Sequence, residues 1–189
     1  MTDAASEPSR PASLAPVAIV VSRYHASLTT RLEDAARAEY LARGGDPANL
    51  GIIEAPGTYE LVALSLAAAN SGLYQGVVAL GIVVRGETDH DRYISAAVAQ
   101  GLVEVTLQTG VPVALGVITA NNTQQAEDRA GGPSGTHKGN KGTEAMAALL
   151  DTLASAGAIR AAAEAGEPAA IAPTITRRIA KLGGTDGLA

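Results

Sequence analysis

The sequence predicts a three-layer α/β/α sandwich around a four-stranded parallel sheet. Two observations support this fold class. Four short runs are mainly apolar and do not alternate regularly with polar residues, which is typical of parallel strands buried on both faces. Segments long enough for a helix follow each run, and such crossovers join parallel strands. Helices must therefore cover both faces of the sheet, as in a doubly wound α/β fold.

Each predicted element has its own signal along the chain. The strands are the β-branched run at 16–22, "NLGIIEA" at 49–55, the clearest run "GVVALGIVV" at 76–84, and 111–119. Pro112 is compatible with the last strand because it stands near the strand start. Apolar residues at helical spacing over 28–41 predict a first helix, which "RGGDP" ends. We expect further helices at 58–72, 88–109, 122–130 and 141–156.

We expect one folded domain over 15–157, flanked by two segments of different composition. Residues 1–14 are rich in Pro, Ser and Ala and predict a flexible arm that lacks the cationic start of a secretory signal. Residues 158–189 are predicted as a tail to which we assign no chemistry. No window reaches the roughly 18–20 apolar residues of a membrane span, so we expect a cytoplasmic protein without a membrane partner.

The composition excludes several classes of site. The chain has no Cys, Phe or Trp, so small aliphatic side chains and Tyr must fill the core. Without Cys there is no disulfide, no cysteine zinc site and no thiol nucleophile. A net charge of −5 argues against nucleic acid as the main partner, because binding it requires a basic face.

Polar residues collect where three predicted strands end. These stretches are "SRYH" at 22–25, "APGTYE" at 55–60 and "RGETDH" at 85–90. Because the carboxyl ends of parallel strands meet at one edge of the sheet, and ligands bind there in open α/β folds, we expect a small-molecule site at this edge. Loops are polar in any protein, so the pattern indicates the place of a site and not its chemistry.

The stretch "TDHD" at 88–91 has a structural and a functional interpretation. Thr88 and Asp91 match a capping box, in which Thr88 caps the helix and Asp91 reaches back to the cap amide. That motif does not use His90, and an imidazole at a helix start is suited to move protons near neutral pH. We expect no metal site, because the consecutive positions 89–91 point in different directions around a helix.

The segment "RAGGPSGTHKGNKG" at 129–142 is rich in glycine and basic residues. Glycine lets backbone N–H groups approach an anion, and Arg129, Lys138 and Lys141 add positive charge. The Gly-Lys-Ser/Thr ending of a P-loop is missing, and no G-x-G-x-x-G follows the first strand. Anion binding and a solvated loop without function both stay open on composition alone.

Five stretches, in order and at compatible spacing over about 16–156, resemble lumazine synthase: "SRYH", "APGTYE", "LGIVVRGETDHDRY", "GVPVALGVIT" and "EDRAGG…KGNKG". The resemblance implies a flavodoxin-like fold and a transferase of riboflavin biosynthesis. Its reaction condenses 5-amino-6-(D-ribitylamino)uracil with 3,4-dihydroxy-2-butanone 4-phosphate to 6,7-dimethyl-8-ribityllumazine and phosphate, without metal or organic cofactor. It also implies a homopentamer with active sites between subunits, which some members build into capsid-like shells.

The same resemblance assigns site residues by position. His90 corresponds to the proton-transfer residue, and Arg129 and Lys141 of the neighbouring subunit complete the catalytic group. The phosphate is expected at Gly86, Glu87, Thr88 and Arg129. The residues expected to bind the pyrimidine and its ribityl chain are Tyr24, Thr58, Glu60, Ile82, Val83, Val84 and Leu115.

Three features depart from the family pattern. Leu115 stands where many members have Phe, so apolar contact is kept but stacking is lost. Asp91 and Arg92 replace an aromatic–acidic pair after the histidine, which moves the carboxylate by about 100° around a helix and leaves open which group orients His90. The Gly-rich loop is longer than in shell-forming members. The longer loop argues against a shell but not against a pentamer. Leu115 and the altered pair after the histidine motivate an alternative function, a catalytically weak member that serves as an assembly scaffold or binds flavin or lumazine.

Overall fold

The computed structural model of the chain describes residues 14–132, 139–166 and 168. Most of the predicted arm and most of the predicted tail lie outside the described residues. The middle of the Gly-rich loop, including Lys138, also lies outside them.

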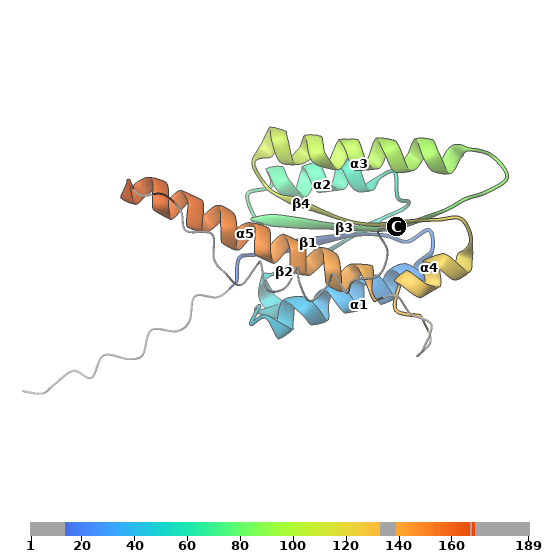
Figure 1. Cartoon of the computed structure of the whole chain (residues 1–189), viewed down its shortest axis with the longest axis horizontal. Helices are drawn as coiled ribbons and strands as arrows, with labels where there is room; N and C mark the ends of the chain where they lie inside the picture. Colours follow the sequence, from blue (N-terminus) through green and yellow to red (C-terminus); the bar gives the residue numbers. More distant parts are fainter. Residues whose placement is uncertain (1–13, 133–138, 167, 169–189) are drawn as a thin grey trace, which may run out of the picture.

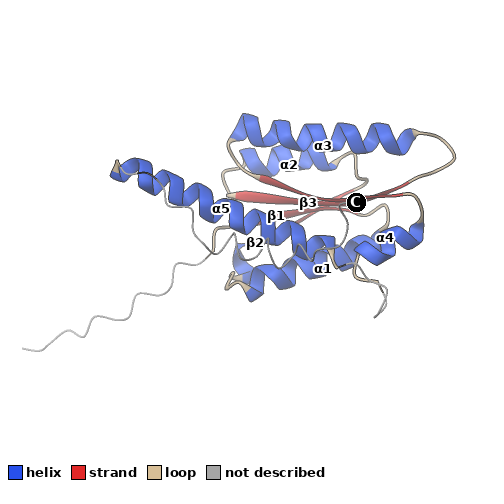
Figure 2. Ribbon diagram, in the orientation of Figure 1, coloured by secondary structure: helices blue, strands red, loops and turns tan. Residues whose placement is uncertain are grey.

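Four parallel strands form one sheet in the order β2-β1-β3-β4. The strands are drawn in red between two layers of helices in Figure 2. The strands are β1 (Val17–Ser22), β2 (Leu50–Ala55), β3 (Gly76–Val84) and β4 (Val113–Ala120). Each coincides closely with a predicted run, and the predicted parallel sheet is confirmed. The strand order reverses direction between β1 and β3, which creates the switch point where ligands bind in such sheets.

Helices cover both faces of the sheet and complete the three layers (Figure 1). One face carries α2 (Leu61–Asn70) and α3 (His90–Thr109), and the other carries α1 (Ala26–Ala42), α4 (Thr123–Arg129) and α5 (Lys141–Ala165). A short 3-10 helix, η1 (Pro47–Asn49), leads into β2. The predicted α/β/α sandwich is confirmed, and the strand order is that of flavodoxin-like folds.

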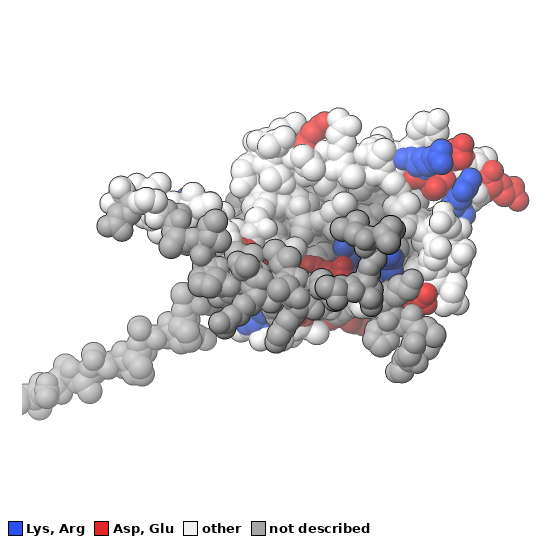
Figure 3. All heavy atoms as spheres, viewed as in Figure 1, with Lys and Arg blue, Asp and Glu red and all other residues white. Residues whose placement is uncertain are grey.

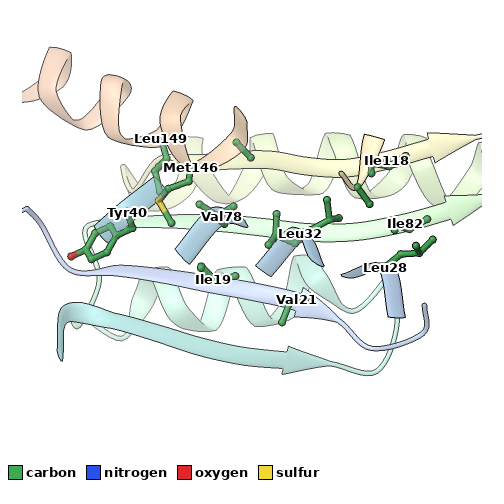
Figure 4. Close-up of a cluster of buried hydrophobic side chains, with 14 of the residues drawn as sticks. Ile19, Val21, Leu28, Leu32, Tyr40, Val78, Ile82, Ile118, Met146 and Leu149 are labelled. Atoms are coloured by element: carbon green, nitrogen blue, oxygen red, sulfur yellow. The ribbon is translucent and has the colours of Figure 1, made fainter. Parts of the chain in front are cut away.

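Two apolar clusters, one on each face of the sheet, hold the layers together. On the α1–α5 face, Ile19 and Val78 of the sheet pack with Leu32, Met146 and Leu149 of the helices (Figure 4). The cluster on the α2–α3 face includes Ala18, Val20, Leu61, Val77, Ala79, Val98 and Leu102. Small aliphatic side chains therefore fill the core, as the composition predicts.

Tyr40 is the one aromatic side chain in the buried core of the described residues. Its hydroxyl donates to the carbonyl of Ala15 at 3.2 Å, which fixes the segment that leads into β1. Burial, with a contribution from the negative charge of Asp46, raises the pKa of the phenol. The neutral phenol is therefore the form that the folded chain stabilises.

The helix α5 is longer than predicted, since it ends at Ala165 and not near 156. The added turns are mostly alanine, and the single Gly157 costs too little to stop the helix, which Gly166 ends at a φ of 72°. With a mean hydropathy of 1.2, α5 has the length and composition of a membrane span. The expectation that no stretch of the chain is long and apolar enough to span a membrane is therefore wrong. Its first turns nevertheless pack on the sheet through Met146 and Leu149, as those of a core helix do.

Candidate active site

The strand β3 extends beyond β1 at the carboxyl edge of the sheet. Pairing between the two strands ends at Val21 and Leu80, whereas β3 stays paired with β4 as far as Val84 and Ala120. The side of β3 that faces β1 is therefore open over residues 81–84. This open side makes the switch point between β1 and β3 a crevice with a backbone edge.

Alternate β3 residues direct their backbone groups into this crevice. The hydroxyl of Thr58 donates to the carbonyl of Ile82 at 3.2 Å, so this carbonyl points away from β4. The amide of Arg85 donates to the carbonyl of Ala120 on β4 and points the other way. Since the direction alternates along a strand, the N–H and C=O of Val84 face the crevice. A flat heterocycle with amide-like groups can pair with them.

A cavity of about 240 Å³ lies at this crevice. Its walls come from the ends of β1 and β3, the turn after β2 and the start of α3. Seven predicted site residues meet in its lining: Tyr24, Thr58, Glu60, Ile82, Val83, Val84 and His90. The volume is below the roughly 300–1,000 Å³ of typical ligand sites, so the cavity has the size of part of a site.

Four lining residues were not among the predicted site residues: His25, Gly57, Tyr59 and Ile94. The first three stand inside the polar stretches that mark the rim, although no motif singles them out. Ile94 lies one turn after His90 on α3, and this spacing of four residues puts both side chains on one face of the helix. The spacing is a signal that could have identified Ile94 from the sequence.

Two tyrosine rings are exposed at the cavity. The exposed fractions of Tyr24 and Tyr59 are 76% and 61%, and an exposed flat ring can stack on a heterocycle. The ring of His25 meets that of Tyr24 edge to face, with centroids 4.9 Å apart and planes at 84°. This contact orients the Tyr24 ring at the mouth of the cavity.

Arg23 holds the end of β1 in place beside these rings. Its guanidinium bridges Glu33 on α1 and Glu54 on β2, each at 2.8 Å, and its amide donates to the carbonyl of Ala55. Partial burial lowers the pKa of Arg23, but the hydrogen bonds and charges of both carboxylates raise it overall. A fixed positive charge thus anchors the turn that presents Tyr24.

Glu60 offers a carboxylate to the cavity from the residue before α2. Its side chain forms no ion pair or hydrogen bond with any residue that the structure describes. Gly57 leaves room for it, because a Cβ at that position would lie 2.7 Å from Oε2 of Glu60. A carboxylate in this setting can accept hydrogen bonds from the hydroxyls of a polyol.

The turn between β3 and α3 carries the residues predicted to hold phosphate. Residues 85–90 are all exposed, and charged side chains of both signs gather at this end of the molecule (Figure 3). Oγ1 of Thr88 lies 2.7 Å from Nδ1 of His90. The imidazole also packs against Gly86, where a Cβ would lie 2.7 Å from Cε1 of the ring. The turn thus places the imidazole beside both the hydroxyl and the cavity.

The predicted capping box is wrong. The helix α3 begins at His90 with Asp89 as its N-cap residue, and no side chain caps it. The hydroxyl of Thr88 contacts the imidazole instead of a backbone amide. Asp91 is 7% exposed, and its Oδ1 has no hydrogen-bond partner in the described part of the chain. Asp91 therefore neither caps α3 nor orients His90.

Three predicted residues lie apart from the cavity. Leu115 and Lys141 line a separate groove between the edge strand β4 and α5, where the Lys141 ammonium lies 3.1 Å from Glu144. Arg129 ends α4, is exposed, and lines neither the cavity nor this groove. Within one chain, the predicted site is therefore divided between two edges of the sheet.

The base of the Gly-rich loop holds Arg129 and Lys141 near each other. Ala130 and Asn140 form an antiparallel bridge across this base. The side chain of Arg31 on α1 donates to the carbonyl of Gly131 at 2.6 Å, and the side chain of Asn140 donates to the carbonyl of Arg31 at 3.2 Å. Arg129 and Lys141 are the neighbours in sequence of this bridged pair, so α1 holds the backbone beside both.

These features define a class of protein: an α/β sandwich with a cavity suited to a flat, polar small molecule at the carboxyl edge of its sheet. In the described ranges no group of three His, Asp or Glu side chains is placed to hold a metal ion. Proton transfer by His90 and hydrogen bonding by the surrounding side chains are the chemistry that this arrangement offers.

The chain belongs to the 6,7-dimethyl-8-ribityllumazine synthase family, whose model matches residues 15–156. The 6,7-dimethyl-8-ribityllumazine synthases of Campylobacter curvus (strain 525.92) and Sulfurovum sp. (strain NBC37-1) are each 41% identical to it over 137 residues, which cover 72% of this chain and 85% of the relative. The synthase of Deinococcus deserti is 38% identical over 136 residues, with the same coverage of both chains. The resemblance to lumazine synthase noted in the sequence is thereby confirmed.

Proposed function

We propose that the chain condenses 5-amino-6-(D-ribitylamino)uracil with 3,4-dihydroxy-2-butanone 4-phosphate to 6,7-dimethyl-8-ribityllumazine. Family membership and the activity named for its relatives support this reaction. The structural observation that carries the proposal is the cavity, where seven residues predicted to serve this reaction meet from three separate segments. The protein is then a transferase of riboflavin biosynthesis.

The cavity accounts for binding of the pyrimidine substrate. The backbone of Val84 pairs with the heterocycle at the open side of β3, and the exposed ring of Tyr24 stacks on it. The carboxylate of Glu60 accepts hydrogen bonds from the ribityl hydroxyls. Thr58 acts through Ile82, because its buried hydroxyl is already engaged with that carbonyl.

The reaction needs proton transfers at every stage. The pyrimidine amine attacks the ketone, and loss of water gives an imine; phosphate leaves by elimination, and ring closure releases a second water. His90 lines the cavity and is suited to accept and release these protons. Backbone N–H groups of the 86–88 turn and the guanidinium of Arg129 stabilise the departing phosphate.

Incubation of the purified protein with both substrates tests this function. Lumazine, followed by its fluorescence, and phosphate should form in equal amounts. His90→Gln should lower the rate by roughly 10²-fold, within the usual range for general acid–base catalysis. Arg92→Gln is the matched control, since Arg92 is exposed on the same turn of α3 but does not line the cavity. If the protein bound riboflavin or lumazine but formed no product, it would be a binder or scaffold instead.

We further propose that the chain forms a homopentamer in which each site is completed by a second copy. The cavity is small, and no Lys or Arg among the described residues lines it, although the phosphate substrate requires positive charge. Leu115 and Lys141 line the groove at the β4 edge of the sheet, and Arg129 ends α4 outside the cavity, so all three can face the cavity of a neighbour. The outer face of α3 also exposes Val103 and Leu107, at 58% and 78%, as apolar surface that a neighbouring copy can cover.

Native mass spectrometry tests the assembly. A five-chain species, or a multiple of five, supports a ring of copies joined by a repeated head-to-tail interface. A monomer or dimer that retains full activity would contradict the shared site. Leu107→Glu should shift the distribution toward single chains, whereas Ile159→Glu, at a site of similar exposure at the far end of α5, should not.

A further inference from the structure

The contact between Thr88 and His90 answers the question of what orients the imidazole. Oγ1 of Thr88 and Nδ1 of His90 are 2.7 Å apart, a normal distance for a hydrogen bond. Asp91, the adjacent carboxylate, is buried and makes no such contact. In the described part of the chain, the hydroxyl of Thr88 is the side-chain group that fixes one nitrogen of the ring.

This hydrogen bond has two forms that differ in the position of one proton. A hydroxyl has one hydrogen to donate and lone pairs that accept, and a neutral imidazole has one N–H. If Thr88 donates to Nδ1, the ring proton is on Nε2. If instead Nδ1–H donates to Thr88, then Nε2 is unprotonated, and the hydroxyl hydrogen is free to bond elsewhere. Only the second form leaves Nε2 able to act as a base.

We propose that a phosphate group bound at the 86–88 turn selects the second form through Thr88. Phosphate oxygens are strong acceptors, so a bound phosphate takes the hydroxyl hydrogen of Thr88. The oxygen of Thr88 then accepts from Nδ1–H, and Nε2 of His90 is left as a base. This inference rests on the proposed function, because it takes from it the position of the phosphate.

The consequence is that the leaving group itself prepares the base. While the phosphate ester is bound, His90 is held in the tautomer that accepts a proton at Nε2. After elimination and release of phosphate, the hydroxyl is free to donate to Nδ1 again, and the ring can carry its proton on Nε2. Thr88 is thus a positioning residue that acts through His90, in addition to its contact with phosphate.

The tautomer of His90 can be measured without any catalysis. The ¹⁵N shifts of the ring nitrogens are recorded at about pH 8.5, where imidazole side chains are generally neutral. The chain has three histidines, so His90→Gln identifies the signals of His90. Inorganic phosphate is the probe, and its binding is followed independently by calorimetry. We expect phosphate to move His90 toward the Nδ1–H form in proportion to occupancy.

Two variants test the role of the Thr88 hydroxyl. Thr88→Ser keeps it and should retain the phosphate response, whereas Thr88→Val has the same shape without it and should abolish the response while phosphate still binds. In the steady state, Thr88→Val should lower kcat roughly tenfold, a modest part of what acid–base catalysis contributes, and Thr88→Ser should restore it. A purely structural role for Thr88 would not produce this serine rescue of the spectroscopic response.

The outcomes separate this inference from the proposed function. A tautomer that does not respond to phosphate, or responds equally in Thr88→Val, overturns the inference even if the protein forms lumazine. Failure of the wild-type protein to bind phosphate overturns it as well. A phosphate response without any lumazine formation supports the inference and contradicts the proposed reaction.

Discussion

The hydroxyl of Thr58 donates a hydrogen bond of 3.2 Å to the carbonyl of Ile82, and so ties the start of α2 to the part of β3 that extends beyond β1. Both residues are buried, and Gly81 next to them leaves the space that Thr58 occupies, since a Cβ there would lie 2.9 Å from its side chain. This bond satisfies the Ile82 carbonyl, so Val84 supplies the backbone edge that is left for a ligand.

Thr58→Val should destabilise the chain and weaken pyrimidine binding. Loss of the hydroxyl leaves the buried Ile82 carbonyl without a donor, which costs about 1–3 kcal/mol in the free energy of unfolding. Urea denaturation measures this cost, and titration with the pyrimidine substrate measures affinity. Thr58→Ser keeps the donor and serves as the control; equal stability of the valine and serine variants would show that the bond contributes nothing.

Gly142→Ala should be severely destabilising. A Cβ at this position would lie 1.9 Å from the carbonyl oxygen of Leu32, so α1 and α5 would have to separate. We expect a loss of at least about 3 kcal/mol, the upper end of typical overpacking costs. Gly157→Ala on the same helix is the matched control, because a Cβ there meets nothing within 4 Å and should stabilise by about 0.5–1 kcal/mol. Similar thermal stability of both variants would be inconsistent with the close packing of α1 and α5.

Arg129→Ala should act on the phosphate-bearing substrate alone. Removal of a guanidinium that pairs with phosphate should raise KM for the butanone phosphate by roughly tenfold or more, with little change in KM for the pyrimidine. Steady-state kinetics with each substrate varied in turn gives both values. Arg160→Ala removes the same charge from an exposed site near the end of α5 and should leave both KM values unchanged. Equal effects on both substrates would point to a general loss of structure.

Stability should fall at alkaline pH because of Tyr40. Burial and the charge of Asp46 raise the pKa of this phenol in the folded chain, so above the ordinary tyrosine pKa of about 10 the unfolded chain binds fewer protons than the folded one. The free energy of unfolding therefore decreases as pH rises above about 10. Tyr40→Phe should show a shallower decrease in denaturation experiments over this range, although it loses the bond to Ala15 at every pH. An unchanged slope would rule out the contribution of this phenol.

The sheet and the cavity lining could be predicted because each depends on local patterns. The run at 76–84 is apolar throughout, and the strand β3 has these bounds. Tyr24, Glu60 and His90 each follow a predicted strand, and the parallel topology alone brings such residues to one edge. The position of the crevice therefore follows from chain order and strand direction.

Other features depend on which of several competing interactions forms, and a sequence pattern does not give the relative strengths of these interactions. "TDHD" matches a capping box, but the hydroxyl of Thr88 contacts the imidazole of His90, and Oδ1 of the buried Asp91 has no hydrogen-bond partner among the described residues. The predicted helix ends too early, at 156, because the composition changes after it, whereas the alanines that follow favour helix. In neither case does residue type alone decide between the alternatives.

The division of the site between two edges follows from the order of the strands. Arg129 and Lys141 come after β4, and β3 separates β4 from the end of β1 that carries Tyr24. Within one chain these residues therefore lie apart from the cavity. In the proposed assembly, a second copy with its β4 edge against the cavity brings them together.

Co-assembly of two impaired variants tests this shared site most directly. His90→Ala chains keep Arg129, and Arg129→Ala chains keep His90, so in a randomly mixed ring about a quarter of the interfaces unite both intact residues. With the butanone phosphate well below its KM, the rate of lumazine formation by co-expressed, co-purified variants should then rise to roughly a quarter of the wild-type rate. Activity of the mixed assembly that equals only the mean of the two separate variants would contradict a site shared between copies.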